Sequence, residues 1–376
     1  MGRATLSRRQ LLAACGTAAG AAILPRGAAV ASSLPYGSRT DLIQLNSNEN
    51  PYGLAARPLE ALTRSGATAS RYPDAREDEL KQALATTHGV MPEQIVLGSG
   101  SSEILRMAGA AFLPGGREIV AAETTFEAVL LYAGVMKAPV TKVPMTSDFR
   151  HDLSPMAAAC GEETGILYVC NPNNPTGTIV GRAELAELMR RVPATAVVLV
   201  DEAYHHFVED ASYGSALELL PRHSNVVVAR TFSKIYGMAG LRLGYAVASQ
   251  ANAAALAKQA AWNNVNAAAI EVALQSLSDA GLVARERQRL NETRRWLCAE
   301  LEKDGRRYVR SHTNFLMIEA GADVGPMIAA FREKGILVGR RFPSMPTWLR
   351  VSMGTPREME AFLSAWRSIV PARAAA

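Results

Sequence analysis

The sequence predicts an α/β protein whose core is a mainly parallel sheet, and three observations support that prediction. Short apolar runs alternate with helical stretches between residues 94 and 248. The runs are continuously apolar, which is typical of strands buried on both faces by covering helices. The chain has 376 residues, enough for a large domain and a smaller one.

Six apolar runs are the predicted strands of this sheet. Helices are predicted ahead of them at Pro58–Ser65 and Asp78–His88, and helical stretches separate the runs themselves. The runs are Gln94–Leu97, Glu118–Ala121, Gly165–Cys170, Ala196–Val200, Asn225–Ala229 and Gly244–Ala248.

The chain changes character from residue 285 onward. A charged helix, Arg285–Lys303, is followed by shorter elements that predict a small α+β unit, which we expect to pack with the N-terminal arm. These elements are the segments Tyr308–Arg310 and Asn314–Ile318, a helix at Asp323–Lys334, and strands at Gly335–Gly339 and Leu349–Ser352. The predicted organisation is a signal over 1–31, an arm over 32–70 that joins the small domain, a large domain over 71–280 and a small domain over 281–376.

The first thirty-one residues have the pattern of an export signal. Arg8 and Arg9 precede an Ala-rich apolar stretch that ends at Leu24, and Ala29–Ala31 has the small-x-small form of a cleavage site. The arginine pair favours a twin-arginine (Tat) signal. We therefore expect an exported or periplasmic protein. An ordinary N-terminus on a cytoplasmic protein is the alternative.

Removal of the signal also removes most of the net charge. The formal charge is +5, and residues 1–31 contribute four arginines and no acidic residue. Subtracting four from 40 leaves 36 basic against 35 acidic residues, a net charge of +1. This argues against nucleic acid as a partner. No apolar run after the signal is long enough to span a membrane.

The cysteines predict neither a disulfide framework nor a metal site. Cys160, Cys170 and Cys298 follow the signal, and they are odd in number and far apart in sequence. Buried or half-buried thiols are therefore expected.

Polar segments follow four of the predicted strands. In open parallel α/β sheets, ligands bind beyond the carboxyl ends of the strands, so we expect these segments to form one site. They are Gly98–Glu103, Asn171–Gly177, Asp201–Tyr204 and Arg230–Lys234.

The first of these segments has the composition of an anion-binding loop. Gly98 and Gly100 allow an anion to approach the backbone closely. Ser101 and Ser102 supply N–H and hydroxyl donors where a helix begins, and there the helix dipole favours negative charge. A capped helix start without a ligand is the alternative.

Asp201 and Lys234 have the strongest chemical implication. A carboxylate after five apolar residues is costly to bury without a partner, and a pyridinium N–H is a suitable one. A desolvated lysine amine loses its proton readily and can form a Schiff base with an aldehyde cofactor. The alternatives are a helix-capping Asp201 and a surface-exposed Lys234.

These segments resemble the class I and II aminotransferases, and most of all the histidinol-phosphate aminotransferase branch. The similarity spans residues 40–368 in the family's order. It implies the pyridoxal-phosphate (PLP)-dependent transferase fold type I, with a mainly parallel seven-stranded sheet in the large domain and a smaller α+β domain. The matching segments are Leu45–Gly53, Arg71–Asp74, Asn171–Gly177, Asp201–Tyr204, Thr231–Tyr245 and Leu349–Thr355.

The resemblance implies that PLP is the cofactor and gives roles to the residues around it. Lys234 would hold the cofactor covalently and move a proton between it and the substrate, and Asp201 would pair with its pyridine nitrogen. Phe126 takes the place of the aromatic residue that stacks on the ring, where the family often has tyrosine. The ring oxygen would be bound by Asn174 and Tyr204, and the phosphate by Ser101, Ser102, Thr231 or Ser233, and Arg242.

The resemblance also implies partners for the site. Tyr72 would reach the cofactor phosphate in a neighbouring subunit, which implies a homodimer with shared active sites. Arg350 aligns with the family's arginine that binds a substrate anion. Arg340 and Asn50 are further substrate-binding candidates, although an insertion near Arg340 and Arg341 leaves it open whether these arginines bind an anion or are solvated.

The function implied is a PLP-dependent aminotransferase. It would move an amino group between an amino acid, or an amino-alcohol phosphate similar to histidinol phosphate, and a 2-oxo acid. The same lysine and aspartate also suit a decarboxylase, lyase, racemase or oxidase, and an exported non-catalytic relative is a third alternative. The export signal favours a substrate other than that of histidine biosynthesis, because that pathway is cytoplasmic.

Overall fold

The computed structural model describes residues 42–370. The predicted signal over 1–31 and the first part of the predicted arm lie outside the described residues, so the export signal stays a prediction. The domain boundaries at 70/71 and 280/281 also stay predictions.

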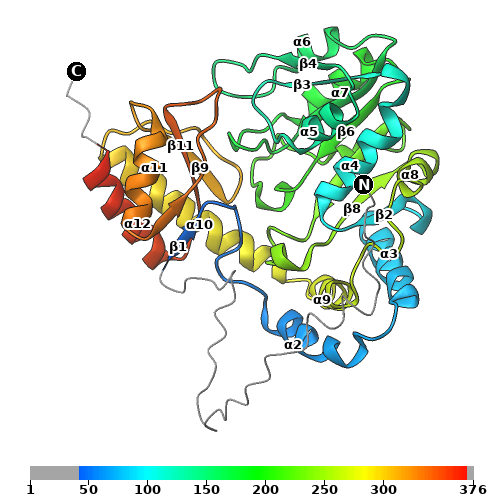
Figure 1. Ribbon diagram of the computed structural model, residues 1–376, viewed down its shortest axis with the longest axis horizontal. Helices are drawn as coiled ribbons and strands as arrows, with labels where there is room; N and C mark the ends of the chain where they lie inside the picture. Colours follow the sequence, from blue (N-terminus) through cyan, green and yellow to red (C-terminus); the bar gives the residue numbers. More distant parts are fainter. Residues whose placement is uncertain (1–41, 371–376) are drawn as a thin grey trace, which may run out of the picture. The chain divides into compact units, whose positions relative to one another are not determined.

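A seven-stranded sheet forms the centre of the part described, in the order β2-β8-β7-β6-β5-β3-β4 (Figure 1). Strands β4, β3, β5, β6 and β7 are mutually parallel, and β8 runs antiparallel to both β7 and β2. The predicted fold class, α/β with a mainly parallel seven-stranded sheet, is therefore confirmed. The strands are β2 (Ile95–Gly98), β3 (Glu118–Ala122), β4 (Val140–Val143), β5 (Thr164–Cys170), β6 (Val197–Asp201), β7 (Val226–Thr231) and β8 (Gly244–Ala248).

Helices bury both faces of this sheet, which explains why its strands are continuously apolar. Successive residues of β5 alternate between two apolar clusters: Ile166 and Tyr168 lie in one, and Leu167 and Val169 in the other. The first cluster includes helices α4 (Ser101–Phe112), α5 (Ala128–Val135) and α8 (Gln250–Ala257). The second includes α6 (Leu153–Ala158) and α7 (Arg182–Arg191).

Only one strand of the sheet is missing from the predicted set, and it lies at the edge. In β4 only Val143 is buried, and Val140 is exposed. An edge strand has neighbours on one side only, so it needs no continuous apolar run and gives a weak sequence signal.

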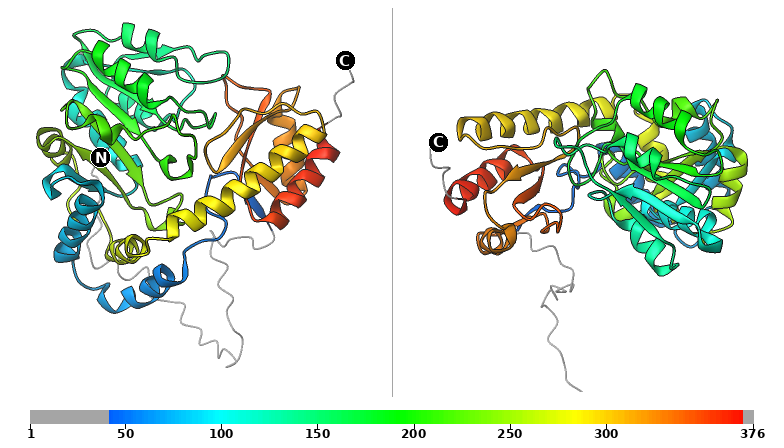
Figure 2. Two further views of the ribbon diagram at one scale, coloured as in Figure 1. Left: turned by 180° about the vertical axis from the view of Figure 1, so that it is seen from behind. Right: turned by 90° about the horizontal axis from the view of Figure 1, so that it is seen from above.

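The C-terminal part is the predicted α+β unit, built on two short sheets. Strand β1 (Ile43–Leu45) pairs in parallel with β10 (Ile336–Val338), which joins the start of the described chain to this part. The other sheet pairs β9 (Phe315–Glu319) with β11 (Trp348–Ser352), antiparallel. Helices α10 (Leu282–Lys303), α11 (Val324–Glu333) and α12 (Pro356–Ile369) accompany them, and α10 is the long yellow helix of Figure 2.

The segment Tyr308–Arg310, whose structure the sequence leaves open, forms no strand. This segment makes only an isolated bridge between Tyr308 and Ile318, and Val309 N donates to Met317 O. Strand β9 pairs with β11 along one edge. Along its other edge it makes only the isolated contacts with this segment.

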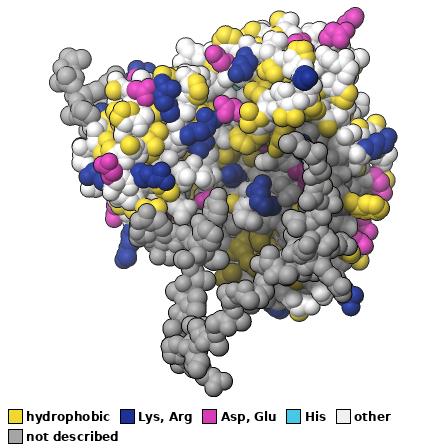
Figure 3. Space-filling model, in the orientation of Figure 1, with side chains coloured by type: hydrophobic (Ala, Val, Ile, Leu, Met, Phe, Trp, Pro, Cys, Tyr) yellow, Lys and Arg dark blue, Asp and Glu magenta, His cyan; other side chains and the backbone are white. Residues whose placement is uncertain are grey.

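Three further helices lie N-terminal to the sheet or beside it: α2 (Ala56–Ser65), α3 (Asp74–His88) and α9 (Ala267–Ser278). Among the described residues, no single helix meets the length and hydropathy expected of a membrane span, and α9 with α10 meets it only as a pair bent by 87°. On the face shown in Figure 3, basic and acidic side chains are interspersed, in keeping with the small net charge expected after removal of the signal.

Candidate active site

A cavity of about 630 Å³ lies at the carboxyl ends of β5, β6 and β7. The four polar segments predicted to meet at this edge of the sheet all contribute to its wall. Residues 46–49 and the segment around β11 close it from the C-terminal part. Twelve of the predicted site residues line it: Ser101, Ser102, Phe126, Asn174, Asp201, Tyr204, Thr231, Ser233, Lys234, Arg242, Arg340 and Arg350.

One end of the cavity is built to receive an anion. Helix α4 starts at Ser101, directly after Gly100, whose φ of 79° favours glycine. A Cβ at Gly100 would also collide with the Arg242 guanidinium. Arg242 Nη1 donates to Ser233 Oγ at 3.3 Å and to the Ala239 carbonyl at 2.9 Å. Within the described chain Arg242 has no carboxylate partner, so its charge and the α4 N-terminus are available to a phosphate.

Asp201 is the last residue of β6 and is 1% exposed. Tyr168 Oη donates to its Oδ2 at 3.0 Å, and Ala203 N donates to its Oδ1 at 3.1 Å. Burial raises the pKa of Asp201 to about 6, while the Tyr168 hydrogen bond opposes this rise. Residues 42–370 provide no salt-bridge partner for this carboxylate, so a cationic ring N–H would supply what is missing.

Lys234 follows β7 and reaches into the cavity from the same edge. Its Nζ donates to the Ser47 carbonyl at 3.2 Å and lies 5.7 Å from the centre of the Tyr204 ring. Burial, and after it the charge of Arg350, lower the pKa of Lys234 to about 8. An amine with this pKa is substantially neutral near pH 8 and can act as a nucleophile and a base.

A hydrogen-bonded group connects Tyr204 to Arg350 across the cavity. Tyr204 Oη accepts from Asn48 Nδ2 at 3.0 Å and from Asn174 Nδ2 at 3.5 Å. Arg350 Nη1 donates to Asn174 Oδ1 at 2.7 Å, and its Nη2 donates to the Asn46 carbonyl at 2.8 Å. The Arg350 Nε atom is buried without a hydrogen-bond partner. A buried, oriented guanidinium with an unused donor can bind a carboxylate or a phosphate.

Two predicted site residues do not line the cavity. Asn50 is buried, and its amide donates to the Ile235 carbonyl at 3.1 Å and to Glu286 Oε2 at 2.9 Å. These bonds hold Asn50 outside the cavity lining, and the substrate contact expected from the sequence stays a prediction. Tyr72 precedes α3 and is 78% exposed, so its expected contact with a neighbouring subunit stays a prediction.

Sequence reasoning missed three residues of the site: Tyr168, Asn48 and Glu127. Tyr168 is the one phenol in the apolar run of β5, which was a usable signal, because a buried hydroxyl needs a partner. Asn48 and Glu127 gave no local signal. Asn48 meets Tyr204 from 156 residues away, and Glu127 forms an ion pair with Arg340, 213 residues away.

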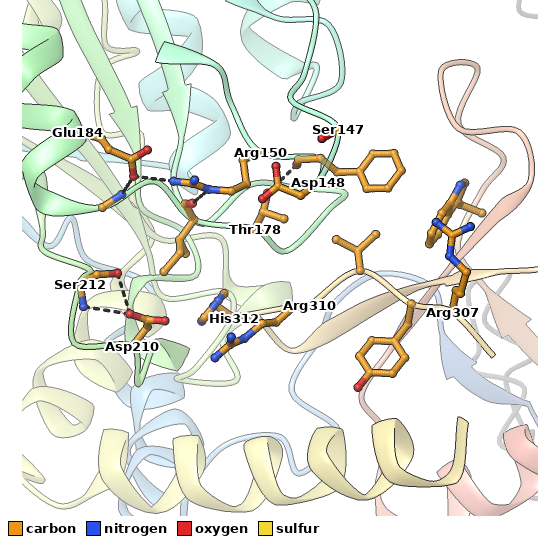
Figure 4. A pocket seen from close by; sticks show the side chains of 16 residues that line it. Ser147, Asp148, Arg150, Thr178, Glu184, Asp210, Ser212, Arg307, Arg310 and His312 are labelled. Carbon is orange, nitrogen blue, oxygen red and sulfur yellow. Dashed lines mark hydrogen bonds and ion pairs between the residues drawn. The ribbon is translucent and has the colours of Figure 1, made fainter. Parts of the chain in front are cut away.

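A second cavity of about 600 Å³, shown in Figure 4, contains none of the predicted site residues. Three of its charged side chains are engaged within the cavity wall. Arg150 Nη2 donates to Glu184 Oε2 at 2.5 Å, and Asp210 Oδ1 accepts from Ser212 Oγ at 2.7 Å. The cavity at the sheet edge, which combines Lys234, an unpaired carboxylate and an anion-binding loop, is therefore the candidate active site.

The fold and this site define the class of the protein. A nucleophilic lysine, a buried carboxylate and a phosphate-binding helix start, all at the carboxyl edge of one sheet, fit pyridoxal 5′-phosphate and its aldehyde, ring nitrogen and phosphate. The described residues contain no cluster of three or more His, Cys, Asp or Glu side chains that could hold a metal ion. The protein is a PLP-dependent enzyme of fold type I.

Comparisons with known proteins give the family. Residues 40–365 match the model of the aminotransferase class I and II family. The chain is 39% identical over 333 residues to a histidinol-phosphate aminotransferase of Moorella thermoacetica, covering 88% of this chain and 86% of the relative. It is 38% identical over 329 residues to histidinol-phosphate aminotransferase 2 of Pseudomonas aeruginosa, covering 86% and 88%.

A solved structure agrees with these relatives. The crystal structure of histidinol-phosphate aminotransferase from Sinorhizobium meliloti, in complex with pyridoxal-5'-phosphate, matches with a TM-score of 0.81 and 25% identity, covering 88% of this chain and 90% of that one. The chain belongs to the class I and II aminotransferase family, and it is a PLP-dependent aminotransferase.

Proposed function

We propose that this aminotransferase takes its amino group from a donor whose anionic group binds Arg350, and passes the amino group to a 2-oxo acid. The observation that carries the proposal is the position of Arg350: it lines the same cavity as Lys234, and Asn174 and the Asn46 carbonyl fix its guanidinium. Amino acids and amino-alcohol phosphates both offer such an anion. The names of the relatives favour a donor similar to histidinol phosphate.

The residues of the cavity divide the work of the reaction. When bound, PLP supplies an aldehyde that takes up the amino group and a ring that withdraws electrons from the donor Cα. Lys234 would hold the cofactor and would be the base that moves the proton at the donor Cα. Asp201 would accept from the ring N–H, and the Tyr168 hydrogen bond favours the carboxylate form of Asp201. The remaining cofactor contacts are assigned to Ser101, Ser102, Phe126, Asn174, Tyr204, Thr231, Ser233 and Arg242.

The active enzyme is proposed to be a homodimer with shared sites. Tyr72 is 78% exposed and Trp262 is 96% exposed, and tyrosine and tryptophan are enriched at protein interfaces. Tyr72 of one protomer would complete the phosphate end of its partner's cavity. The end of the cavity that holds Asp201 and Lys234 is lined by residues of its own chain.

The enzyme is also proposed to be exported by the Tat route. Arg8, Arg9 and the following apolar stretch support this. A fusion of residues 1–35 to a fluorescent protein is expected to reach the periplasm, and the Arg8→Lys/Arg9→Lys form to stay in the cytoplasm. Equal distribution of the two fusions would argue for a cytoplasmic enzyme.

The central assignment is tested with borohydride. Reduction of the cofactor-loaded protein is expected to fix the cofactor to the peptide that contains Lys234, as measured by mass spectrometry. Labelling elsewhere, or none, would remove the basis of the site. A donor screen across amino acids and histidinol phosphate then follows loss of the visible absorbance of the lysine-bound cofactor. Consumption of the donor while that band is retained would favour a decarboxylase, lyase or racemase instead, because those reactions return the cofactor to the lysine.

A further inference from the structure

Part of the cavity wall comes from a segment that we call the strap, residues 339–347 between β10 and β11, of which Arg340 and Phe342 line the cavity. The strap contacts the loop before α5 at two points. Arg340 Nη2 donates to Glu127 Oε2 at 2.5 Å, and Thr124 Oγ1 donates to Ser344 Oγ at 2.8 Å. Both Arg340 and Glu127 line the cavity. An ion pair between two distant parts of the chain therefore forms part of the substrate-binding wall.

Arg340 lies close enough to Arg350 to act on the same ligand. The Phe342 ring lies 4.3 Å from the Arg340 guanidinium carbon and 5.4 Å from that of Arg350. The charge of Arg340 also contributes to lowering the pKa of Arg350, after the larger effect of burial. A substrate anchored at Arg350 would thus place its distal group against Phe342, Arg340 and Glu127.

Glu127 alters the net charge of the part of the cavity that would contact the distal group of the substrate. Arg350 has no carboxylate partner in the described chain, whereas Arg340 is neutralised by Glu127. The pair is half exposed, at 52% for Arg340 and 48% for Glu127, so the attraction between them is modest and a ligand can compete with it. The distal region therefore has no net charge from these two residues.

We propose that Glu127 is a specificity-determining residue, which neutralises Arg340 and so makes the cavity favour substrates with one anionic group and an uncharged distal end over substrates with two anionic groups. This inference rests on the proposed role of Arg350 as the anion anchor. It concerns the substrate class and leaves the chemistry at Lys234 unchanged. Glu127 would act on the substrate through charge and would take no part in proton transfer.

The test uses two unreactive probes of equal chain length, succinate with two carboxylates and butyrate with one. Their Kd values are measured by calorimetry on the cofactor-loaded protein, and the ratio Kd(butyrate)/Kd(succinate) reports the second anion alone. Glu127→Gln is expected to raise this ratio about threefold, and Arg340→Gln to lower it about threefold, because the two changes alter the local charge in opposite directions. The Glu127→Gln/Arg340→Gln double variant restores the neutral balance and is expected to return to the wild-type ratio.

A matched control lies one residue away. Arg341 forms an ion pair with Asp323 at 2.6 Å and with similar exposure, 44% and 49%, but neither residue lines the cavity. Asp323→Asn is therefore expected to leave the ratio unchanged. The effect of Glu127→Gln should fade at 1 M salt, where the Debye length is about 3 Å.

The outcomes separate this inference from the proposed function. If Glu127→Gln and Arg340→Gln shift the ratio in the same direction, the pair merely positions the strap, and the inference is overturned. Unchanged ratios in both variants overturn it as well, while the anion site at Arg350 stands. If the wild-type protein binds neither probe, the anion site fails and the inference fails with it.

Discussion

At the scale of single residues, the site depends on two groups whose proton affinities are altered by burial. Lys234 and Asp201 belong to neighbouring strand ends, and burial favours the neutral form of each. For the lysine, this produces a nucleophile near neutral pH. For the aspartate, it works against the ionised form that a ring nitrogen needs, and the Tyr168 hydrogen bond works in the opposite direction.

The first prediction concerns Lys234. Because its pKa is lowered from 10.5 to about 8, the rate of cofactor incorporation into cofactor-free protein is expected to rise with pH and level off above pH 8. Stopped-flow absorbance after mixing with PLP measures this rate. Arg350→Met removes a charge that lowers this pKa, so its midpoint should move to higher pH. A wild-type rate that still rises beyond pH 10 would contradict the assignment.

The second prediction concerns Tyr168. Its hydrogen bond lowers the pKa of Asp201, so Tyr168→Phe is expected to raise that pKa and to move the acid limb of kcat toward higher pH. At pH 5.5 the loss in kcat should be about three- to tenfold, which corresponds to about 0.7–1.4 kcal/mol, the size of a typical single hydrogen bond. Tyr308→Phe, far from the cavity, serves as the control. A uniform loss at every pH would show that Tyr168 affects packing instead.

Sequence reasoning reached the cofactor residues and the two arginines Arg340 and Arg350 of the cavity, but it also placed Asn50 there. Asp201, Lys234 and Ser101 each stand at a strand end or a helix start, where position along the chain already suggests the chemistry. Nothing in the sequence distinguishes Asn50 from the asparagines just before it, yet its amide donates to the Ile235 carbonyl and to Glu286. Which asparagine faces a cavity depends on the local path of the backbone, and residue type does not encode it.

At the scale of elements, the edge of the sheet is held by a buried ion pair behind the cavity. Arg230 in β7 donates from Nε and Nη2 to Glu202 Oε2, just after β6, at 3.0 and 2.8 Å. Ser215 Oγ donates to the same carboxylate. The pair joins the strand ends that carry Asp201 and Lys234, so it fixes the spacing between them.

The third prediction tests this pair by stability. The side chains of Arg230 and Glu202 are 6% and 0% exposed, so Arg230→Ala leaves a buried, unpaired carboxylate. We expect the free energy of unfolding to fall by about 3–5 kcal/mol, measured by urea denaturation at fixed protein and cofactor concentrations.

A matched variant separates burial from charge. Arg182→Ala breaks the exposed Arg182–Glu218 pair, whose side chains are 57% and 48% exposed, and it should cost less than about 1 kcal/mol. Equal losses in the two variants would show that burial of the Glu202 pair has no special effect.

The elements themselves were largely predictable because most of them are buried on both faces or have an apolar stripe. The runs at β5, β6 and β7 agree with the observed strands to within two residues at either end. Strand β4 escaped notice because its exposed positions need not be apolar, and the sequence left the structure of Tyr308–Arg310 open. Pairing is a property of two segments, and one segment alone cannot reveal it.

At the scale of the whole molecule, the proposed dimer would make each active site depend on a residue of the other protomer. Tyr72 lies outside the cavity of its own chain, as a residue that serves a partner's site would. If sites are shared, a damaged Tyr72 and a damaged Lys234 on different protomers would leave one intact site in the mixed dimer.

The fourth prediction tests whether a mixed dimer contains one intact active site. Lys234→Ala and Tyr72→Ala homodimers are each expected to be impaired, and co-expressed mixed dimers, isolated with two affinity tags, should recover one working site of two. Activity per dimer is the measurement, with a mixture of the two purified homodimers as the control. Mixed dimers no more active than that mixture would mean that each protomer works alone.

The parallel pairing of β1 with β10 has a consequence for the order of events during synthesis. Asn46 and Asn48, near the start of the described chain, meet Arg350 and Ser352, near its end, across 304 residues. A ribosome must therefore release almost the whole polypeptide before the substrate wall can exist, however early the central sheet forms. If the protein is exported in the folded state, as proposed, export would have to wait until the segment that contains Arg350 and Ser352 has been made and folded.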